Sequence, residues 1–457
     1  MRRSARRAVP GVRGAVRRQA VSKERIKFPV RIGLLGCGTV GGGVIRLIQD
    51  NQEYLTSRVG APLEIRHVLV RDPEKDRVPE CRREWITTDA EELLGKDIDV
   101  LVEVMGGEEP AKSLIERAIR EGKSVVTANK LLLAKHGPEL VDEAVEAGVD
   151  LAFEASVGGG IPIIRTLREA LTSDWVESVH GILNGTCNYI LTRMRDGKVS
   201  FDVALAEAQA KGYAEADPSL DVDGHDAAQK LCVISMLAFG ANVREADVPV
   251  EGIRPVDQLD FRFAERFGYT IKHLVIGKDL GDRIALRVHP ALIPRGSVLA
   301  NIDGVLNGVL IVGRGLGPCL LVGRGAGDMP TAVSVVADIV DVARSKIGGE
   351  PGLSTRGIQT KERQLAPITE VLSRFYLRFD VEDRPGVLGK IATGLGEAGV
   401  SIEQMVQEGR ADEASGAVPV LIITHSCREG AVRAALDAIG REGFMRGRPR
   451  LLRIEDV

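Results

Sequence analysis

Residues 30–41, VRIGLLGCGTVG, decide the fold of this chain. The apolar run at 30–35 predicts a buried strand, and the pattern G-x-G-x-x-G follows it at Gly36, Gly38 and Gly41. A helix is expected directly afterwards, from about residue 40 to 49. In this strand–turn–helix context the glycines admit a pyrophosphate close to the backbone, and the helix N-terminus supplies N–H donors. The stretch therefore predicts a dinucleotide site.

The segments that follow alternate between strands and helices, which predicts βαβ units and a parallel sheet. After the glycines at 158–160 the pattern changes to two helices and a series of strands up to about residue 322. Residues 371–457 follow the order βαββαβ, which is typical of a ferredoxin-like domain. We expect an α/β protein: a Rossmann-type parallel sheet, then an α+β domain with its own sheet, then a ferredoxin-like domain. The expected boundaries are 1–27 for a basic extension, 28–155, 156–345, 346–370 for a linker, and 371–457.

The composition narrows the range of expected partners and locations. The 457 residues carry a net charge of −3, which gives no reason to expect nucleic acid as a partner. No apolar run is long enough for a membrane span, so we expect no membrane association. The six cysteines are scattered, which favours reduced thiols and a cytoplasmic location. Residues 1–27 contain ten basic residues and one acidic residue; a disordered extension, a start codon set too far upstream and a transit peptide all remain open.

The end of the second strand bears on which dinucleotide binds. NAD sites usually place an acidic residue there for the ribose 2′-hydroxyl, whereas an arginine accommodates a 2′-phosphate. This chain has Arg71 followed by Asp72. Arg71 favours NADP(H), although the spacing from Gly36 is longer than usual and Asp72 leaves NAD possible.

Two further segments carry chemistry. Lys130 follows the fourth strand, where the carboxyl ends of parallel strands face a ligand. The acidic loop at 212–226 precedes a helix on which Asp226 and Lys230 share one face, and Asp223 is placed to cap that helix. A lysine on an otherwise apolar helix is partly desolvated and could donate a proton. The carboxylates suit either a cationic ligand or a divalent metal, and the absence of a His pair at ligand spacing argues against zinc.

Taken together, these residues resemble homoserine dehydrogenases. The likeness covers about residues 30–345, and Cys187 departs from it by standing where Thr is common. The matching strings are residues 33–41 (GLLGCGTVG), 127–130 (TANK), 153–162 (FEASVGGGIP), 181–190 (GILNGTCNYI), the acidic loop ending at Lys230, and the glycine turn at 323–331.

The resemblance implies reversible reduction of L-aspartate 4-semialdehyde to L-homoserine, in the biosynthesis of threonine, methionine and isoleucine. It also implies that the α+β domain at 156–345 is the catalytic and dimerisation domain. Lys230 would then donate the proton to the carbonyl oxygen, and Lys130 would contact both substrate and cofactor. Asp226 would hold the hydroxyl side of the substrate and orient the lysine. Glu215 would bind the substrate ammonium group.

The same likeness implies the ligands of two bound groups. For NADP, with NAD possible, the predicted and implied contacts are Gly36, Gly38, Thr39, Val40, Gly41, Arg71, Lys130, Gly212 and Gly327. A sodium ion would be bound, mostly through backbone carbonyls, by Glu154, Val157, Gly159 and Ile161.

The C-terminal block resembles an ACT domain, because Asp383-Arg384-Pro385-Gly386-Val387-Leu388 follows a strand within the βαββαβ order. The resemblance implies an amino-acid effector, most plausibly threonine, and a homodimer or homotetramer. An ACT domain used only for assembly remains open.

Two other functions are weighed against this one. A non-catalytic NADP(H)-sensing regulator would keep the glycines but would have no use for the lysines and carboxylates together. Aspartate-semialdehyde dehydrogenase would need a nucleophilic cysteine, for which Cys187 is the one suggestive position.

Overall fold

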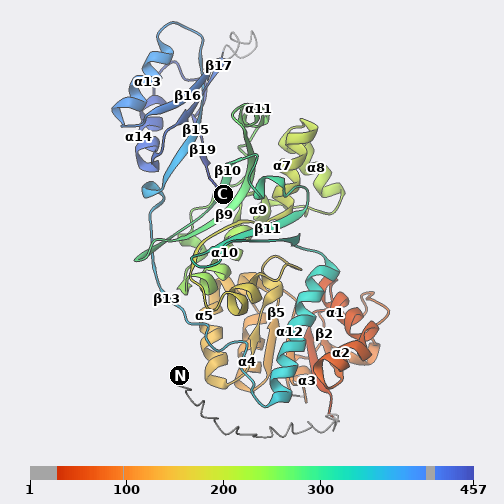
Figure 1. Ribbon diagram of the computed structural model, residues 1–457. Coiled ribbons are helices and arrows are strands. Elements are labelled where there is room, and N and C mark those ends of the chain that lie inside the picture. Colours follow the sequence, from red (N-terminus) through yellow and green to blue (C-terminus); the bar gives the residue numbers. More distant parts are fainter. Residues whose placement is uncertain (1–27, 96, 408–416) are drawn as a thin grey trace, which may run out of the picture.

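The computed structural model describes residues 28–95, 97–407 and 417–457, so the extension expected at 1–27 lies outside the described residues. The chain forms three parts, and the first of them also includes one helix from later in the sequence (Figure 1). The first part contains a parallel sheet with the strand order β3-β2-β1-β4-β5-β6. Its strands are β1 (Val30–Leu35), β2 (Leu63–Leu69), β3 (Ile86–Thr87), β4 (Val100–Glu103), β5 (Ser124–Thr127) and β6 (Leu151–Ala152).

The helices around this sheet are α1 (Thr39–Asp50), α2 (Gln52–Val59), α3 (Ala90–Leu94), α4 (Ala111–Arg120), α5 (Lys130–Ala147) and, from much later in the chain, α12 (Asp328–Gly348). Neighbouring residues of a strand point to opposite faces of the sheet, so both faces carry apolar side chains. Helices therefore cover both faces. Leu34 packs in the core that contains α1, α2 and α12, whereas Leu35 packs in the core that contains α3, α4 and α5. The predicted Rossmann-type sheet is confirmed.

The second part is built on antiparallel strands in the order β12-β11-β7-β9-β10. Its strands are β7 (Val176–Ile182), β8 (Ala241–Asn242), β9 (Tyr269–Asp279), β10 (Arg283–Pro294), β11 (Leu306–Gly313) and β12 (Gly317–Arg324). Its helices are α6 (Ile163–Arg165), α7 (Gly185–Gly197), α8 (Phe201–Ala210), α9 (Ser219–Val222), α10 (His225–Ala238) and α11 (Gln258–Arg266). Apolar residues of α10, such as Leu231 and Ile234, share a core with Leu133 of α5 and Val288 of β10. Helix α10 is therefore packed between the first two parts.

The third part contains β15 (Leu372–Glu382), α13 (Val387–Glu397), β16 (Ile402–Gln407), β17 (Ala417–Thr424), β18 (Cys427–Arg428), α14 (Glu429–Ile439) and β19 (Arg450–Ile454). Its sheet has the antiparallel order β19-β15-β17-β16, which confirms the ferredoxin-like prediction. Strand β19 also pairs in parallel with β10, at Ala291–Arg453 and Leu292–Ile454. The second and third parts thus share one 11-stranded sheet, which the sequence pattern did not predict.

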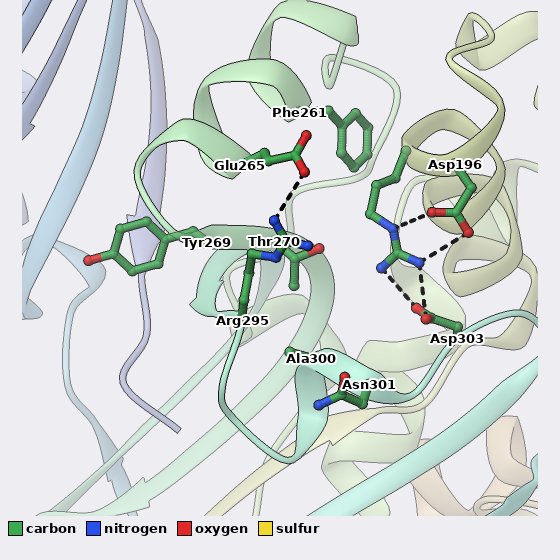
Figure 2. Close-up of a pocket in the computed structure, with 10 residues that line it drawn as sticks. Asp196, Phe261, Glu265, Tyr269, Thr270, Arg295, Ala300, Asn301 and Asp303 are labelled. Carbon is green, nitrogen blue, oxygen red and sulfur yellow. Dashed lines mark hydrogen bonds and ion pairs between the residues drawn. The ribbon is translucent and has the colours of Figure 1, made fainter.

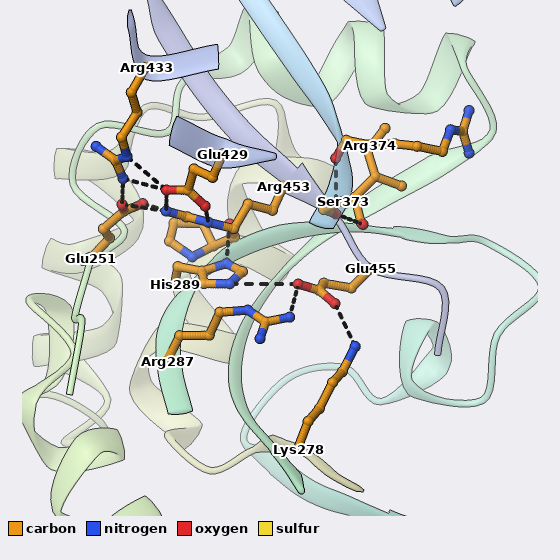
Figure 3. A network of polar contacts seen from close by, with 12 residues as sticks. Glu251, Lys278, Arg287, His289, Ser373, Arg374, Glu429, Arg433, Arg453 and Glu455 are labelled. Atoms are coloured by element: carbon orange, nitrogen blue, oxygen red, sulfur yellow. Dashed lines mark hydrogen bonds and ion pairs between the residues drawn. The ribbon is translucent and has the colours of Figure 1, made fainter. Parts of the chain in front are cut away.

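A network of buried charges holds β19 in this position (Figure 3). The Arg453 guanidinium, 1% exposed, donates through Nε to Glu429 at 2.7 Å and through Nη1 to Glu251 at 2.8 Å. Near the chain end, the Glu455 carboxylate accepts from Arg287 at 2.6 Å. Glu251 and Arg287 belong to the second part, so the Arg453–Glu251 and Arg287–Glu455 ion pairs cross the junction between the two parts.

The segment expected as a linker runs along the first two parts. The Asp150 carboxylate accepts hydrogen bonds from the backbone N–H of Gly352 at 2.9 Å and of Ser354 at 2.8 Å. Two short strands follow, β13 (Lys361–Glu362) beside β8 and β14 (Gln364–Leu365) beside β10. Within the described ranges, the structure contains no helix with the length and apolar character needed to cross a membrane.

Candidate active site

A cavity of about 950 Å³ lies where the first and second parts meet. Its lining combines residues that are far apart in the sequence. The predicted site residues that line it are Val40, Lys130, Gly159, Gly212, Glu215, Asp226, Lys230 and Gly327. The structure therefore brings the predicted substrate residues and part of the predicted cofactor set into one space.

The glycine loop lies at one end of this cavity and suits a phosphate group. Gly36 has φ +99°, a conformation that side chains other than glycine rarely adopt. A Cβ at Gly41 would lie 2.4 Å from the carbonyl oxygen of Gly36, so only glycine fits. Helix α1 begins at Thr39, and no side chain caps its N-terminus. Its first N–H groups are therefore available to an anion, as a dinucleotide pyrophosphate requires.

Elsewhere in the lining of this cavity, one carboxylate holds two lysines. The Asp226 Oδ2 atom lies 2.7 Å from Lys230 Nζ, and Oδ1 lies 3.2 Å from Lys130 Nζ. Lys130 begins α5 after the Asn129 side chain caps that helix, whereas Asp226 and Lys230 lie one turn apart on α10. Lys230 Nζ also donates to the carbonyl oxygen of Leu183 at 2.7 Å. The cluster thus joins the ends of two helices from different parts.

The cluster is electrostatically compensated. Asp226 is 5% exposed, and burial alone would raise its pKa. The charges of Lys230 and Lys130, with hydrogen bonds from Lys230 and Asn184, outweigh burial and lower the pKa of Asp226 to about 2. Asp226 is therefore ionised at any pH at which the protein would work, so it holds cations and does not itself donate a proton.

Sequence reasoning missed two residues beside this cluster. The Asn184 side chain donates to Asp226 Oδ2 at 2.8 Å and to Asp221 Oδ1 at 2.7 Å. Burial raises the pKa of Asp221, and the nearby charge of Asp226 raises it further. Both residues stand in strings that we had singled out, but nothing in the sequence showed that an amide joins the two carboxylates.

The acidic loop differs in one respect from our expectation. Asp223 does not cap α10, because Gly224 stands before the first helical residue with φ +94°. The Asp223 carboxylate accepts instead from Arg254 Nε at 2.6 Å. Glu215 is exposed at the cavity lining, where its carboxylate can meet a cationic group.

The expected sodium residues lie in the glycine-rich turn between the first two parts. The Glu154 carboxylate, 4% exposed, accepts from the backbone N–H of Ile164 at 2.9 Å and of Arg165 at 2.7 Å. The Gly159 carbonyl accepts from Ser334 Oγ at 2.7 Å. In the part of the chain that the structure describes, no group of three His, Cys, Asp or Glu residues is placed to hold a metal. A cation here would have to be coordinated by carbonyl oxygens, and these are suitable ligands for sodium.

Arg71 bears on the choice between NADP and NAD, and Cys187 bears on the alternative enzyme that needs a nucleophilic cysteine. Arg71 is exposed shortly after the end of β2, while the neighbouring Asp72 carboxylate accepts the backbone N–H of Glu74 at 2.9 Å. Burial raises the pKa of Cys187 well above its usual value, and its sulfur lies 3.2 Å from the Asp221 carbonyl oxygen. A buried neutral thiol is a poor nucleophile, which removes the basis for an aspartate-semialdehyde dehydrogenase.

A second hollow of about 250 Å³ contains none of the predicted site residues (Figure 2). Its charges are paired with each other: Arg295 with Glu265 at 3.0 Å, and Arg195 with Asp303 at 3.0 Å. The predicted substrate residues line the larger cavity instead.

Comparison with protein families finds three matches along the chain. Residues 36–154 match the model described as "Homoserine dehydrogenase, NAD binding domain", and residues 162–340 match "Homoserine dehydrogenase". Residues 375–443 match "ACT domain".

Proteins named homoserine dehydrogenase are similar to this chain over nearly their whole length. A homoserine dehydrogenase of Synechocystis sp. is 43% identical over 435 residues, which are 93% of this chain and 99% of that protein. The crystal structure of a homoserine dehydrogenase from Thiobacillus denitrificans has a TM-score of 0.88 at 41% identity, covering 94% of this chain and 99% of that one. A hyperthermophilic archaeal homoserine dehydrogenase mutant, solved in complex with NADPH, has a TM-score of 0.60 at 27% identity, covering 71% of this chain and 100% of that one.

Replacing Asp226 with Asn tests the compensated cluster. Removing one member of a buried ion pair should lower the free energy of unfolding at pH 7 by about 3 kcal/mol. The pKa of Asp226 is depressed in the folded chain, to about 2, so its contribution is complete above the unfolded value of about 3.9 and is lost as the pH falls towards 2. The difference in the free energy of unfolding between parent and variant should be measured by urea denaturation at pH 7, 5 and 3. It should be equal at pH 7 and pH 5, and smaller at pH 3.

The exposed Asp217 provides a matched control in the same loop, and Asp217→Asn should change the unfolding free energy at pH 7 by less than about 0.5 kcal/mol. Equal effects of the two substitutions would show that Asp226 is not a compensated buried charge.

Proposed function

This chain belongs to the homoserine dehydrogenase family, and on that premise we propose that Lys130, Asp226 and Lys230 form its reaction centre. It is an NAD(P)-dependent oxidoreductase that interconverts L-aspartate 4-semialdehyde and L-homoserine. Its C-terminal ACT domain is consistent with regulation. The pathway that we propose for it is the biosynthesis of threonine, methionine and isoleucine.

A nicotinamide cofactor would supply the hydride for the aldehyde carbon when bound, or take it up in the reverse direction. Charge then develops on the carbonyl oxygen, and Lys230 Nζ donates a proton to it. Two of the three N–H donors of Lys230 are engaged, with Asp226 and with the Leu183 carbonyl. The third remains for a substrate oxygen.

The other side chains orient the substrate. Asp226 holds both lysine ammonium groups and, through them, the hydroxyl side of the substrate. Lys130, whose side chain is 32% exposed, contacts substrate and cofactor. The exposed carboxylate of Glu215 binds the substrate ammonium group. These contacts fix the reacting carbon relative to the proton donor, which accounts for much of the rate enhancement that a protein can supply.

One observation carries this proposal. A single carboxylate, Asp226, holds a lysine from the dinucleotide-binding part and another from the second part within one cavity. A protein that only sensed the cofactor would have no need of this arrangement.

We propose NADP(H) as the preferred cofactor, with NAD also accepted. The cofactor contacts would be Gly36, Gly38, Thr39, Val40, Gly41, Arg71, Lys130, Gly212 and Gly327. Arg71 is exposed shortly after β2, so its guanidinium can meet a ligand phosphate. The Asp72 carboxylate already accepts the backbone N–H of Glu74, which disfavours its binding a ribose hydroxyl. The archaeal relative solved with NADPH agrees with this preference.

Two further ligands and an assembly belong to the proposal. A sodium ion would be held by Glu154, Val157, Gly159 and Ile161, whose turn packs tightly enough that a Cβ at Gly159 would lie 2.6 Å from the Gly325 carbonyl oxygen. Threonine is the effector proposed for the ACT domain. Among the described strands β16 pairs with β17 alone, so its outer edge is available to a second copy in a homodimer or homotetramer.

The deciding experiment is a steady-state assay with homoserine, run with NADP and with NAD, with and without threonine, and with sodium chloride replaced by choline chloride. Homoserine-dependent reduction of NADP, slowed by threonine and by removal of sodium, is the expected result. Cofactor binding without any homoserine-dependent reduction would favour a regulator that senses NADP(H).

Replacing Lys230 with Ala should lower kcat at least 100-fold, because general acid catalysis contributes about 10²–10⁴-fold. The dissociation constant for NADPH, measured by fluorescence titration, should change less than threefold. Lys135→Ala is the matched control, since Lys135 lies on the surface of α5 with its side chain 45% exposed. A Lys230→Ala enzyme with the turnover of the Lys135→Ala enzyme would show that the proton comes from elsewhere.

Replacing Arg71 with Ala should raise the KM for NADP about tenfold or more, because hydrogen bonds to a charged group contribute about 1.5–3 kcal/mol. The KM for NAD should stay within twofold, since NAD lacks the 2′-phosphate. Arg66→Ala serves as control on β2, where Arg66 pairs with Glu64 at 2.7 Å. Equal changes for both cofactors would place Arg71 away from the 2′-phosphate.

A further inference from the structure

Two cysteines meet beside the dinucleotide loop. Cys37 stands between the first two glycines of the pattern, and its sulfur lies 3.9 Å from that of Cys81. Both residues are partly exposed, whereas Cys187 and Cys232 are buried. Within the described residues, no other pair of cysteine sulfurs lies within hydrogen-bonding distance.

The segment that carries Cys81 is held against the start of α1. A Cβ at Gly42 would lie 2.9 Å from a methyl carbon of Val78, so this helix turn and the segment are in close contact. The Cys81 N–H donates to the Val78 carbonyl at 2.9 Å, which closes a turn around the sulfur. The Arg46 and Glu80 side chains lie 3.9 Å apart across the same boundary. The two sulfurs are thus neighbours because two packed backbone segments place them there.

The two thiols differ in reactivity. The Cys37 thiol donates to the Cys81 sulfur, and this hydrogen bond together with the charge of Arg77 outweighs burial and lowers the pKa of Cys81 to about 7. The pKa of Cys37 is raised by the same hydrogen bond and by burial. Cys81 therefore provides the nucleophilic thiolate, and Cys37 lies next to it as the resolving thiol.

We propose that Cys37 and Cys81 form a peroxide-oxidisable pair whose disulfide weakens cofactor binding. Formation of the disulfide is inferred from the geometry of the sulfurs alone. Its effect on cofactor binding rests on the proposed cofactor site at Gly36–Gly41.

The chemistry balances with hydrogen peroxide as the oxidant. The Cys81 thiolate attacks one peroxide oxygen, so that an S–O bond forms, the O–O bond breaks and hydroxide leaves. The Cys37 sulfur then attacks the Cys81 sulfenic sulfur; the S–S bond forms as the S–O bond breaks, and the departing hydroxide leaves as water with the Cys37 proton. The two thiols together lose two electrons, and the peroxide gains these electrons and is reduced to water. A dithiol reductant reverses the change.

The disulfide would displace the loop that binds phosphate. A disulfide holds its sulfurs about 2.0 Å apart, so the two sulfurs must approach from the present 3.9 Å, and we expect the tightly packed loop that carries Cys37 to move with its sulfur. The backbone N–H groups of the loop between Gly36 and Gly41 would then lose their alignment with the pyrophosphate. Displacements of about 1 Å can cost about 100-fold in enzyme sites, so we expect the dissociation constant for NADPH to rise at least tenfold.

The test exposes the full-length protein to hydrogen peroxide and measures two things separately. Mass spectrometry of peptides cut without reduction should show a linked pair containing Cys37 and Cys81, lost after dithiothreitol. Fluorescence titration should show weaker NADPH binding that dithiothreitol restores. Saturating NADPH should slow the formation of the linked pair, because binding and oxidation oppose each other.

Cys81→Ser, with Cys81→Ala as a second variant, should bind NADPH like the parent and keep that affinity after peroxide. Cys319→Ser, a partly exposed cysteine on β12, is the matched control and should stay as sensitive as the parent. Absence of the linked pair, or peroxide sensitivity unchanged in Cys81→Ser, would overturn the proposed pair. A linked pair with unchanged NADPH affinity would overturn its effect on the cofactor while leaving the active-site proposal intact.

Discussion

The proposed active site depends on one buried carboxylate that has two lysines as partners. Asp226 is 5% exposed, and a charge so deeply buried is stable only when opposite charges and hydrogen bonds surround it. Lys130 comes from the start of α5 and Lys230 from α10, one turn after Asp226. The carboxylate therefore ties the dinucleotide-binding part to the second part at the point where the substrate would lie. It also keeps the lysines close together despite their like charges.

Close approach of backbone segments gives the rest of the cavity its shape. The glycine loop can form because a Cβ at Gly41 is absent beside the Gly36 carbonyl, and the turn at Gly159 lies against Gly325 for the same reason. These contacts leave room for a ligand and place helix N–H groups and glycine backbone around it. Cys37 belongs to this tightly packed loop, which is why a small movement of its sulfur would matter to a bound dinucleotide.

The ACT domain is joined to the second part by a shared sheet and not only by a linker. Arg453 in β19 binds Glu251, and the backbone near Glu251 is hydrogen bonded to the segment that precedes α10, since Ile253 N–H donates to the Val222 carbonyl at 2.8 Å. A continuous set of contacts thus runs from the ACT domain to the helix that carries Asp226 and Lys230. This arrangement is consistent with the regulation that the ACT domain indicates.

Local sequence determined much of this protein. The alternation of apolar runs with glycine turns predicted the parallel sheet and the βαββαβ block, because strand and helix periodicity are properties of neighbouring residues. Lys130, Asp226 and Lys230 could be singled out because strand ends and helix faces follow from short spacings. Their roles came from resemblance to a family. Only the tertiary structure showed that Asp226 holds both lysines, that Asn184 joins it to Asp221, that β19 extends the sheet of the second part, and that Cys37 and Cys81 are neighbours. The residues of each such group come from different elements, so their meeting depends on how sheets and helices pack, and no local pattern in the chain contains that information.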